Sequence, residues 1–323
     1  MRNITSDIKN GTYKSCYLLY GEEEYLKRQF KNNLIYGICN DDTMNYSYYE
    51  GKDIDVNSII AMCETLPFFA DKRIVIVENS GIFKSSQEPL AEYISGILET
   101  TCLVFVEKEV DKRNKVYKKI KENGYVCELN RQPVEFLEKW ISGKLSSEGK
   151  KITRNTMGLF LDTVGYDMDN ICTELEKIIS YCLDKEVVED SDIKLLCTPK
   201  ITSKVFDMID AISYKNQEKA MKIYYELIAN REAPLMILYM LSRQFNIMLQ
   251  ISELVNNGFN SKQIADKTGI APFIISKTMR QINNFSITFL KETLSEGVEL
   301  EEKVKSGNMN DQMAVEMLII KCC

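Results

Sequence analysis

The 323-residue sequence contains no histidine, which excludes catalysis by Ser-His or Cys-His pairs, a histidine general base and a histidine-ligated metal. Glycine (15) and proline (6) are scarce, which disfavours a turn-rich all-β fold and favours long helices. No apolar run approaches the ~18 residues of a membrane-spanning helix, and the N-terminus lacks the apolar core of a signal peptide. We therefore expect a soluble, cytoplasmic protein with no membrane partner.

The charge balance gives no overall signature of nucleic-acid binding. Lysine and arginine number 41 against 47 aspartates and glutamates, a net charge of −6, so any DNA contact needs a local basic patch. The ten cysteines are scattered, with no C-x-x-C motif. This pattern favours reduced, mostly buried thiols over a disulfide framework, and it predicts no metal site.

The first ~130 residues alternate short apolar runs with amphipathic segments. β-branched and aromatic residues predict strands at 16–20, 45–49, 74–77, 102–106 and 125–127. Helical patterns lie between them, near 22–38, 55–65, 87–98 and 112–123. Alternating strands and helices predict an α/β domain, residues 1–132, with a mainly parallel sheet covered on both faces.

Beyond Pro133, which fits the first position of a helix, strand signals nearly vanish. We expect a small helical lid domain at 133–203, with residues 183–202 as its closing connection, and an all-α domain at 204–323. The helix from Pro234 carries an apolar stripe wide enough for a bundle core. The predicted helices are 133–147, 154–164, 168–183, 205–213, 216–229, 234–256, 261–267, 272–283, 286–306 and 310–321, and the stripe consists of Leu238, Leu241, Phe245, Met248 and Leu249.

The turn after the first strand is where an α/β domain would hold nucleotide phosphates. It contains Gly21 followed by three glutamates, Glu22 to Glu24, without the second glycine and the hydroxyl of a P-loop. The glutamates suit a helix N-terminus and would repel a triphosphate. We therefore predict no nucleotide at this turn and no cofactor.

Residues 261–281 have the pattern of a helix-turn-helix, with Gly269 at the turn and several basic residues nearby. The same geometry recurs in ordinary helical bundles. A DNA-binding regulator using 261–281 and a plain bundle corner both remain open, and the second is favoured.

Two adjacent aromatic residues, Phe68 and Phe69, follow Leu66 and Pro67 in a short loop between a predicted helix and a predicted strand. Neighbouring side chains leave the backbone in different directions, so the two rings cannot easily both face the core. From the residues alone, a core position is favoured over an exposed binding pair of the hot-spot kind.

A basic cluster on the predicted helix 112–123 has acidic neighbours and is interpreted first as a solvated face, with a subunit or phosphate contact as the alternative. The cluster consists of Lys112, Arg113, Lys115, Lys118, Lys119 and Lys121. No arrangement of carboxylates or nucleophiles resembles a catalytic site. The sequence therefore predicts a protein without enzymatic activity of its own.

Several segments together resemble the delta subunit of the bacterial DNA polymerase III clamp loader. They follow the order of that family along nearly the whole chain. The segments are 17–26 (YLLYGEEEYL), 66–77 (LPFFADKRIVIV), 110–113 (VDKR) with Tyr117 and Lys118, 170–175, 206–211 (FDMIDA), 241–245 (LSRQF), and 269–273 (GIAPF) with Phe285 and Ser286.

The resemblance implies a degenerate ATPase-associated α/β module, a helical lid and a helical collar that joins a hetero-oligomer of clamp-loader subunits. Family members bind no ATP, and this chain also lacks the Ser-Arg-Cys motif and the cysteine zinc module of the related loader subunits. The resemblance further implies a non-catalytic subunit that binds the sliding clamp and opens the ring, with primer-template DNA reached through the assembled complex. It places the family's hydrophobic wedge on Phe68 and Phe69, with Leu66 and Pro67 shaping the loop.

Overall fold

The computed structural model describes residues 2–40, 42–270 and 272–323. The chain divides into two compact units, Met1–Gln132 and Pro133–Cys323, which are described separately below. The described residues include no helix that is long and apolar enough to cross a membrane. A further division of the second unit near residue 203 stays a prediction.

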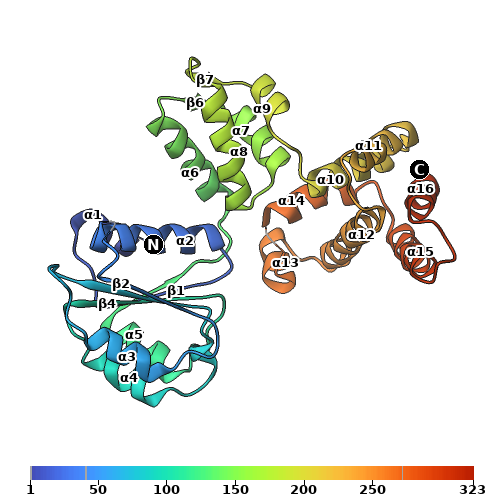
Figure 1. The fold of residues 1–323 in the computed structure, drawn as a ribbon. Helices are drawn as coiled ribbons and strands as arrows, with labels where there is room; N and C mark the ends of the chain where they lie inside the picture. Colours follow the sequence, from blue (N-terminus) through green and yellow to red (C-terminus); the bar gives the residue numbers. More distant parts are fainter. Residues whose placement is uncertain (1, 41, 271) are drawn as a thin grey trace. The chain divides into compact units, whose positions relative to one another are not determined.

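The first unit is a three-layer α/β domain around a five-stranded parallel sheet with the strand order β2-β3-β4-β1-β5. Helices α1 and α2 cover one face, and α3, α4 and α5 cover the other (Figure 1). The predicted α/β class and all five predicted strands are confirmed. The elements are α1 (Arg2–Asn10), β1 (Cys16–Tyr20), α2 (Glu24–Cys39), β2 (Tyr46–Glu50), α3 (Val56–Glu64), β3 (Arg73–Glu78), the 3₁₀ turn η1 (Ile82–Lys84), α4 (Glu88–Ser95), β4 (Thr101–Glu107), α5 (Lys115–Asn123) and β5 (Tyr125–Glu128).

The central strands are apolar along their whole length because both of their faces are covered. All five residues of β1 are buried, and so are all seven of β4. Leu18 and Phe105 belong to the core under α3, α4 and α5. The edge strand β2, which is partly exposed, carries the polar and aromatic sequence YSYYE.

The second unit is helical apart from a short parallel pair of two-residue strands, β6 and β7. Its long helices confirm the helical class predicted beyond Pro133, although α10 begins at Ile201 rather than at the predicted residue 205. The elements are α6 (Val134–Ser147), β6 (Lys151–Ile152), α7 (Arg154–Val164), α8 (Met168–Tyr181), β7 (Val187–Val188), α9 (Asp190–Leu196), α10 (Ile201–Ser213), α11 (Gln217–Ala229), α12 (Pro234–Asn256), α13 (Ser261–Thr268), α14 (Pro272–Ile282), α15 (Ile287–Lys305) and α16 (Asp311–Cys322).

Helix α12 is central to the α10–α16 bundle and contacts α10, α14, α15 and α16. The predicted stripe forms its core face: Leu238, Leu241, Phe245 and Met248 are buried, and Leu249 is half-buried against the same cluster. The 3.6-residue period identified this helix correctly because its apolar face is repeated over six turns.

The prediction for residues 183–202 was incomplete, since this stretch contains β7 and α9 as well as connecting loops. Helix α9 has only seven residues, and its start depends on a reciprocal capping box between Glu189 and Asp192. A helix with so few apolar residues shows little periodicity. Helix α1, which precedes the first strand, was not predicted either.

All ten cysteines are free, and eight of them are buried. Burial raises the pKa of the Cys63 thiol to about 12. Thiols of this kind stay protonated at neutral pH and behave as small apolar side chains, as the scattered spacing predicted.

Candidate binding site at the 66–69 loop

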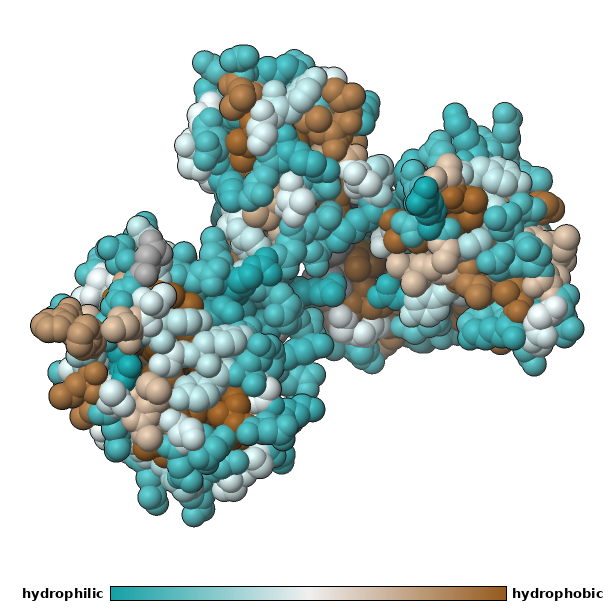
Figure 2. Space-filling view, viewed as in Figure 1, coloured by the Kyte–Doolittle hydropathy of each residue, from teal (hydrophilic) through white to brown (hydrophobic). Residues whose placement is uncertain are grey.

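The loop between α3 and β3 exposes three large apolar side chains. Leu66 is 71% exposed, Phe68 56% and Phe69 95%. The two rings meet edge to face with their centroids 4.6 Å apart, which is a favourable aromatic geometry. The core position favoured from the residues alone is therefore wrong, and both rings face outward. Apolar side chains project from the left edge of the α/β unit in Figure 2.

A buried side-chain amide holds the backbone of this loop. Asn45 is completely buried immediately before β2. Its Oδ1 accepts a hydrogen bond from the backbone N–H of Phe68 at 2.6 Å, and its Nδ2 donates to the Phe68 carbonyl oxygen at 2.8 Å. The same Nδ2 donates to Asp42 Oδ2 at 2.7 Å. Three of the four hydrogen bonds that a carboxamide can make are thereby formed.

The start of the loop is tied to the sheet by Arg73, the first residue of β3. Its Nη1 donates to the carbonyl oxygens of Met62 at 3.2 Å and Thr65 at 3.0 Å, which satisfies groups at the end of α3. Thr101 Oγ1 donates to the carbonyl oxygen of Cys63, within α3 itself, at 2.6 Å, a bond that involves none of residues 66–69. Asn45 and Arg73 were not predicted as parts of the site, because a pattern in one segment does not show which distant side chain will contact it.

Phe69 has a left-handed backbone conformation with φ 48°. A residue with a Cβ pays about 1–2 kcal/mol for this conformation. Phe69 is also the most exposed residue of the loop, so burial of its own side chain does not offset this backbone strain. The loop therefore combines a fixed backbone, local strain and an apolar tip, a combination expected of a binding element.

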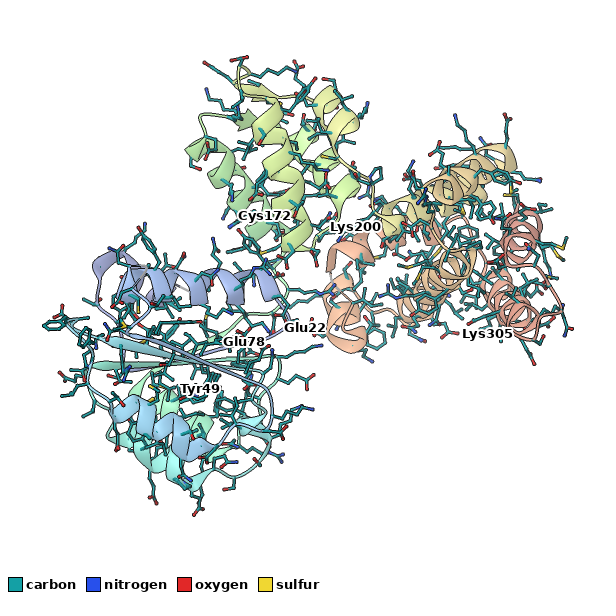
Figure 3. The ribbon with its side chains drawn as sticks, viewed as in Figure 1. Glu22, Tyr49, Glu78, Cys172, Lys200 and Lys305 are labelled. Carbon is teal, nitrogen blue, oxygen red and sulfur yellow. The ribbon has the colours of Figure 1, made fainter. Side chains whose placement is uncertain are left out.

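The turn at Gly21, at the opposite edge of the sheet, has two of its N–H groups engaged. The N–H of Gly21 donates to the Glu107 carbonyl oxygen at 3.3 Å, and that of Glu23 donates to the Leu129 carbonyl oxygen at 2.8 Å. A Cβ on residue 21 would lie 2.3 Å from that same Leu129 oxygen, so the segment after β5 fills the space above the turn. Figure 3 labels Glu22 in this turn. Phosphate cradles need free N–H groups, and these two are used within the chain.

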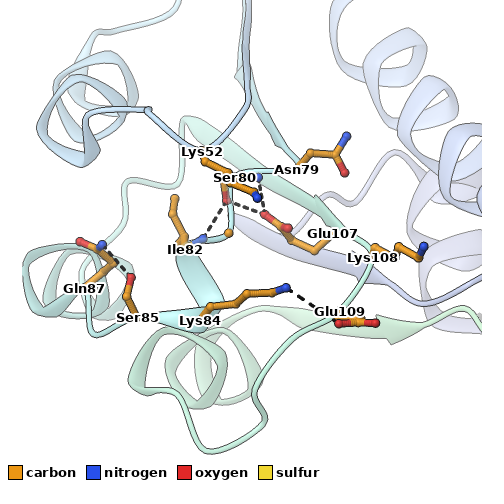
Figure 4. A pocket seen from close by; sticks show the side chains of 11 residues that line it. Lys52, Asn79, Ser80, Ile82, Lys84, Ser85, Gln87, Glu107, Lys108 and Glu109 are labelled. Carbon is orange, nitrogen blue, oxygen red and sulfur yellow. Dashed lines mark hydrogen bonds and ion pairs between the residues drawn. The ribbon is translucent and has the colours of Figure 1, made fainter.

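A cavity of about 460 Å³ lies beside the carboxyl ends of β2, β3 and β4 (Figure 4). Within it the buried Glu107 carboxylate accepts hydrogen bonds from the Ser80 N–H at 2.9 Å and the Ser80 hydroxyl at 2.5 Å. Lys84 pairs with Glu109 at 3.9 Å. Three lysines and two glutamates line the cavity, so its charge is nearly balanced. Its lining comprises Lys52, Asn79, Ser80, Gly81, Ile82, Lys84, Ser85, Gln87, Glu107, Lys108 and Glu109.

Most cations of the predicted basic cluster have carboxylate partners. The pairs are Lys112 with Glu128, Arg113 with Asp111, Lys115 with Glu88 and Lys119 with Glu122. The Arg113 partner holds the pKa of Asp111 at about 2. Paired exposed charges of this kind favour the solvated-face interpretation. Among the described residues no cluster of cysteine and carboxylate side chains could hold a metal ion.

The helix-turn-helix pattern at 261–281 forms α13, the left-handed turn at Gly269 and α14, with Ala271 outside the described residues. The side chains of Thr278 and Gln281 on α14 are buried against α10 and α12: Gln244 donates to Thr278 at 3.2 Å, and Gln281 donates to Asp210 at 2.6 Å. Lys277 is bonded to Asp162 at 3.1 Å. A recognition helix needs a free polar face, so the packing favours the bundle-corner interpretation.

Comparison with known proteins gives consistent matches. Residues 17–130 match the family model described as "DNA polymerase III, delta subunit", and residues 202–322 match "DNA polymerase III delta subunit, C-terminal domain". The chain is 23% identical to the DNA polymerase III subunit delta of Bacillus subtilis, covering 99% of this chain and 96% of that one. It is 24% identical to the probable DNA polymerase III subunit delta of Aquifex aeolicus, over 79% and 75% of the two chains.

Among solved structures, the fold is similar to that of the Bacillus subtilis DNA clamp loader delta protein. The TM-score is 0.75 at 23% identity, and the match covers 99% of this chain and 98% of that one. The likeness supports the fold described above, including the α/β unit that carries the 66–69 loop.

The strained backbone at Phe69 gives the first prediction. We expect Phe69→Gly to be more stable than Phe69→Ala by about 1 kcal/mol, because glycine adopts a left-handed φ without a Cβ penalty. Phe68 has no positive φ, so at that position we expect the reverse order, with Phe68→Ala more stable than Phe68→Gly. Urea unfolding of the four variants measures both differences. The same order at both positions would contradict the left-handed assignment.

Proposed function

Because the chain belongs to the family of DNA polymerase III delta subunits, we propose that it binds the sliding clamp through the 66–69 loop and opens the ring for loading onto primed DNA. The observation that carries this proposal is the exposed aromatic pair Phe68 and Phe69 on a backbone held by Asn45. Leu66 adds a third apolar side chain, and Pro67 restricts the backbone between them. Rigid exposed aromatics are the usual anchors of protein interfaces.

Ring opening follows from differential binding. A wedge that contacts the clamp better when one subunit interface is open shifts the ring toward the open state. The chain needs no chemical step for this, and binding free energy alone drives the change. The role is that of a non-catalytic subunit of the replicative polymerase assembly.

We propose that ATP acts in the assembly through other subunits. In this chain the N–H groups of Gly21 and Glu23 bond to Glu107 and Leu129, and Lys27, buried below the turn, donates to Glu24 at 2.8 Å and to the Glu107 carbonyl oxygen at 3.3 Å. Lys27 lies six residues after Gly21, which is the spacing of a P-loop lysine, but its ammonium is directed into the protein. The turn supports neither nucleotide binding nor hydrolysis.

We propose that residues 204–323 form the collar that joins the other clamp-loader subunits, with 133–203 as the lid, and that the assembled complex acts in the cytoplasm and brings the chain to primer-template DNA. Helix α16 supports the collar assignment because it is apolar on two sides. Val315 and Leu318 are buried in the bundle, whereas Met313, Met317 and Ile320 are exposed at spacings of four and three residues. A second apolar stripe on a helix suits a helix of a neighbouring subunit.

The wedge is tested by titrating the purified chain against the sliding clamp from the same source. We expect the Phe68→Ala/Phe69→Ala variant to bind about 1,000-fold more weakly, because truncating central aromatic anchors typically costs about 2 kcal/mol each. Leu183→Ala is the control, since Leu183 is equally exposed but lies in the second unit. Clamp binding by the double variant at wild-type affinity would move the site away from the loop.

The collar is tested by mixing the chain with the other clamp-loader subunits and measuring complex formation by size-exclusion chromatography. Met317→Lys places a charge in the proposed contact, so we expect loss of the complex, while binding to the isolated clamp stays unchanged. The Phe68→Ala/Phe69→Ala variant should show the opposite pattern. Normal assembly of the Met317→Lys variant would exclude α16 from the interface.

The nucleotide proposal is tested by thermal unfolding with Mg-ATP. A ligand that binds the folded state at 100 times its Kd stabilises it by about 2.7 kcal/mol, so binding would raise Tm with concentration. We expect no shift for this chain up to millimolar Mg-ATP, and a clear shift for a control protein with a complete P-loop. A saturable rise in Tm would show that a nucleotide site exists.

A further inference from the structure

We propose that Asn45 is the positioning residue of the wedge: its buried amide selects the one loop conformation that presents Phe69 to the clamp. This inference rests on the proposed function, and it adds a residue that lies outside the apolar contact itself. The argument depends on the hydrogen bonds of Asn45, on its burial and on the backbone of Phe69.

A carboxamide pairs with a peptide group because it offers one acceptor and one donor side by side. Asn45 uses this geometry on Phe68, accepting from its N–H at 2.6 Å and donating to its carbonyl oxygen at 2.8 Å. Between neighbouring strands the backbone makes such paired bonds to one residue. The 66–69 loop lies outside the sheet, and the Asn45 side chain supplies them instead.

The orientation of the Asn45 amide is itself determined. Its second Nδ2 hydrogen is bonded to Asp42 Oδ2 at 2.7 Å. The backbone carbonyl oxygen of Asn45 accepts a hydrogen bond from the Ile74 N–H of β3 at 2.9 Å. Exchange of the amide oxygen and nitrogen would place a nitrogen against the Phe68 N–H. The sheet and Asp42 therefore fix both the place and the direction of the amide.

Loss of the loop conformation would leave the buried Asn45 Oδ1 and one Nδ2 hydrogen without their partners. An unsatisfied buried polar group is costly, so the Asn45 bonds oppose the strain at Phe69, whose φ is 48°. Holding the peptide of Phe68 also determines where the next residue points. A loop already ordered in its bound form does not lose conformational entropy on binding.

Three variants of the full-length chain test the proposal. Asn45→Ala removes the amide. Asp42→Ala leaves the amide in place but removes the carboxylate that orients it. Asp42 is more exposed than Asn45, so this second variant is easier to make without unfolding the protein. Thr101→Val is the matched control. It removes the buried hydrogen bond to the Cys63 carbonyl oxygen and leaves the contacts of Phe68 intact.

The first measurement uses chymotrypsin on the free chain, with mass spectrometry to follow cleavage after Phe68. We expect cleavage to be about tenfold faster in Asn45→Ala, because losing the hydrogen bonds to Phe68 makes the open, cleavable form of the loop about tenfold more populated. In Asp42→Ala we expect a smaller increase. The Thr101→Val variant should be cleaved at the wild-type rate, even if its Tm falls as far as that of Asn45→Ala. Unchanged cleavage in both Asn45→Ala and Asp42→Ala would overturn the proposal.

The second measurement is affinity for the sliding clamp, alone and in the Phe68→Ala/Phe69→Ala background. We expect Asn45→Ala to weaken binding about tenfold in the wild-type background and to have no effect without the two rings, because residues that act through one contact are not additive. An equal loss in both backgrounds, or faster cleavage with unchanged affinity, would overturn the positioning role.

The two measurements separate this proposal from the proposed function. If the Phe68→Ala/Phe69→Ala variant binds the clamp normally, the clamp site is wrong and the positioning role falls with it. The chymotrypsin result then shows whether Asn45 orders the loop for some other contact. If the rings matter and Asn45→Ala does not, the clamp site stands and only the positioning role is lost.

Discussion

The buried carboxamide of Asn45 is the interaction on which the exposed loop depends. It is completely buried, and its donor and acceptor both bond to Phe68. A buried amide must find partners, so the loop has little freedom to change while the sheet is intact. The strain at Phe69 and the exposure of both rings persist because the polar contact below them is more costly to lose.

The carboxyl and amino edges of the parallel sheet, where its strands end and begin, differ in structure. The carboxyl edge, where α/β proteins usually bind ligands, is closed at the Gly21 turn by backbone contacts with Glu107 and Leu129. The 66–69 loop lies at the amino edge, just before β3. In the proposed function the α/β unit is a support for an apolar contact, a use that the fold alone does not indicate.

Periodic segments were predictable from the sequence because burial repeats along them. The five strands follow from short runs rich in β-branched and aromatic residues, and α12 follows from an apolar stripe with a period of 3.6 residues. The orientation of Phe68 and Phe69 was not predictable, because a short loop has no period and its partner Asn45 lies before the preceding strand. The resemblance to a family supplied the wedge, whereas the residues alone favoured the core. Short capped elements such as α9 carry too few apolar residues to be recognised.

The size of the apolar surface limits what the loop can do to a ring. Shifting an equilibrium from 1:99 to 99:1 needs about 5.5 kcal/mol of preference for one state. Full burial of a phenylalanine contributes about 1.5–3 kcal/mol, and Phe68 is already nearly half-buried in the free chain. The two rings together therefore fall short of this preference, even if every contact forms only with the open ring. In the proposed function, Leu66 and the fixed backbone therefore contribute as well. Leu66 adds apolar area to that of the rings, and a loop that is already ordered loses no conformational entropy on binding.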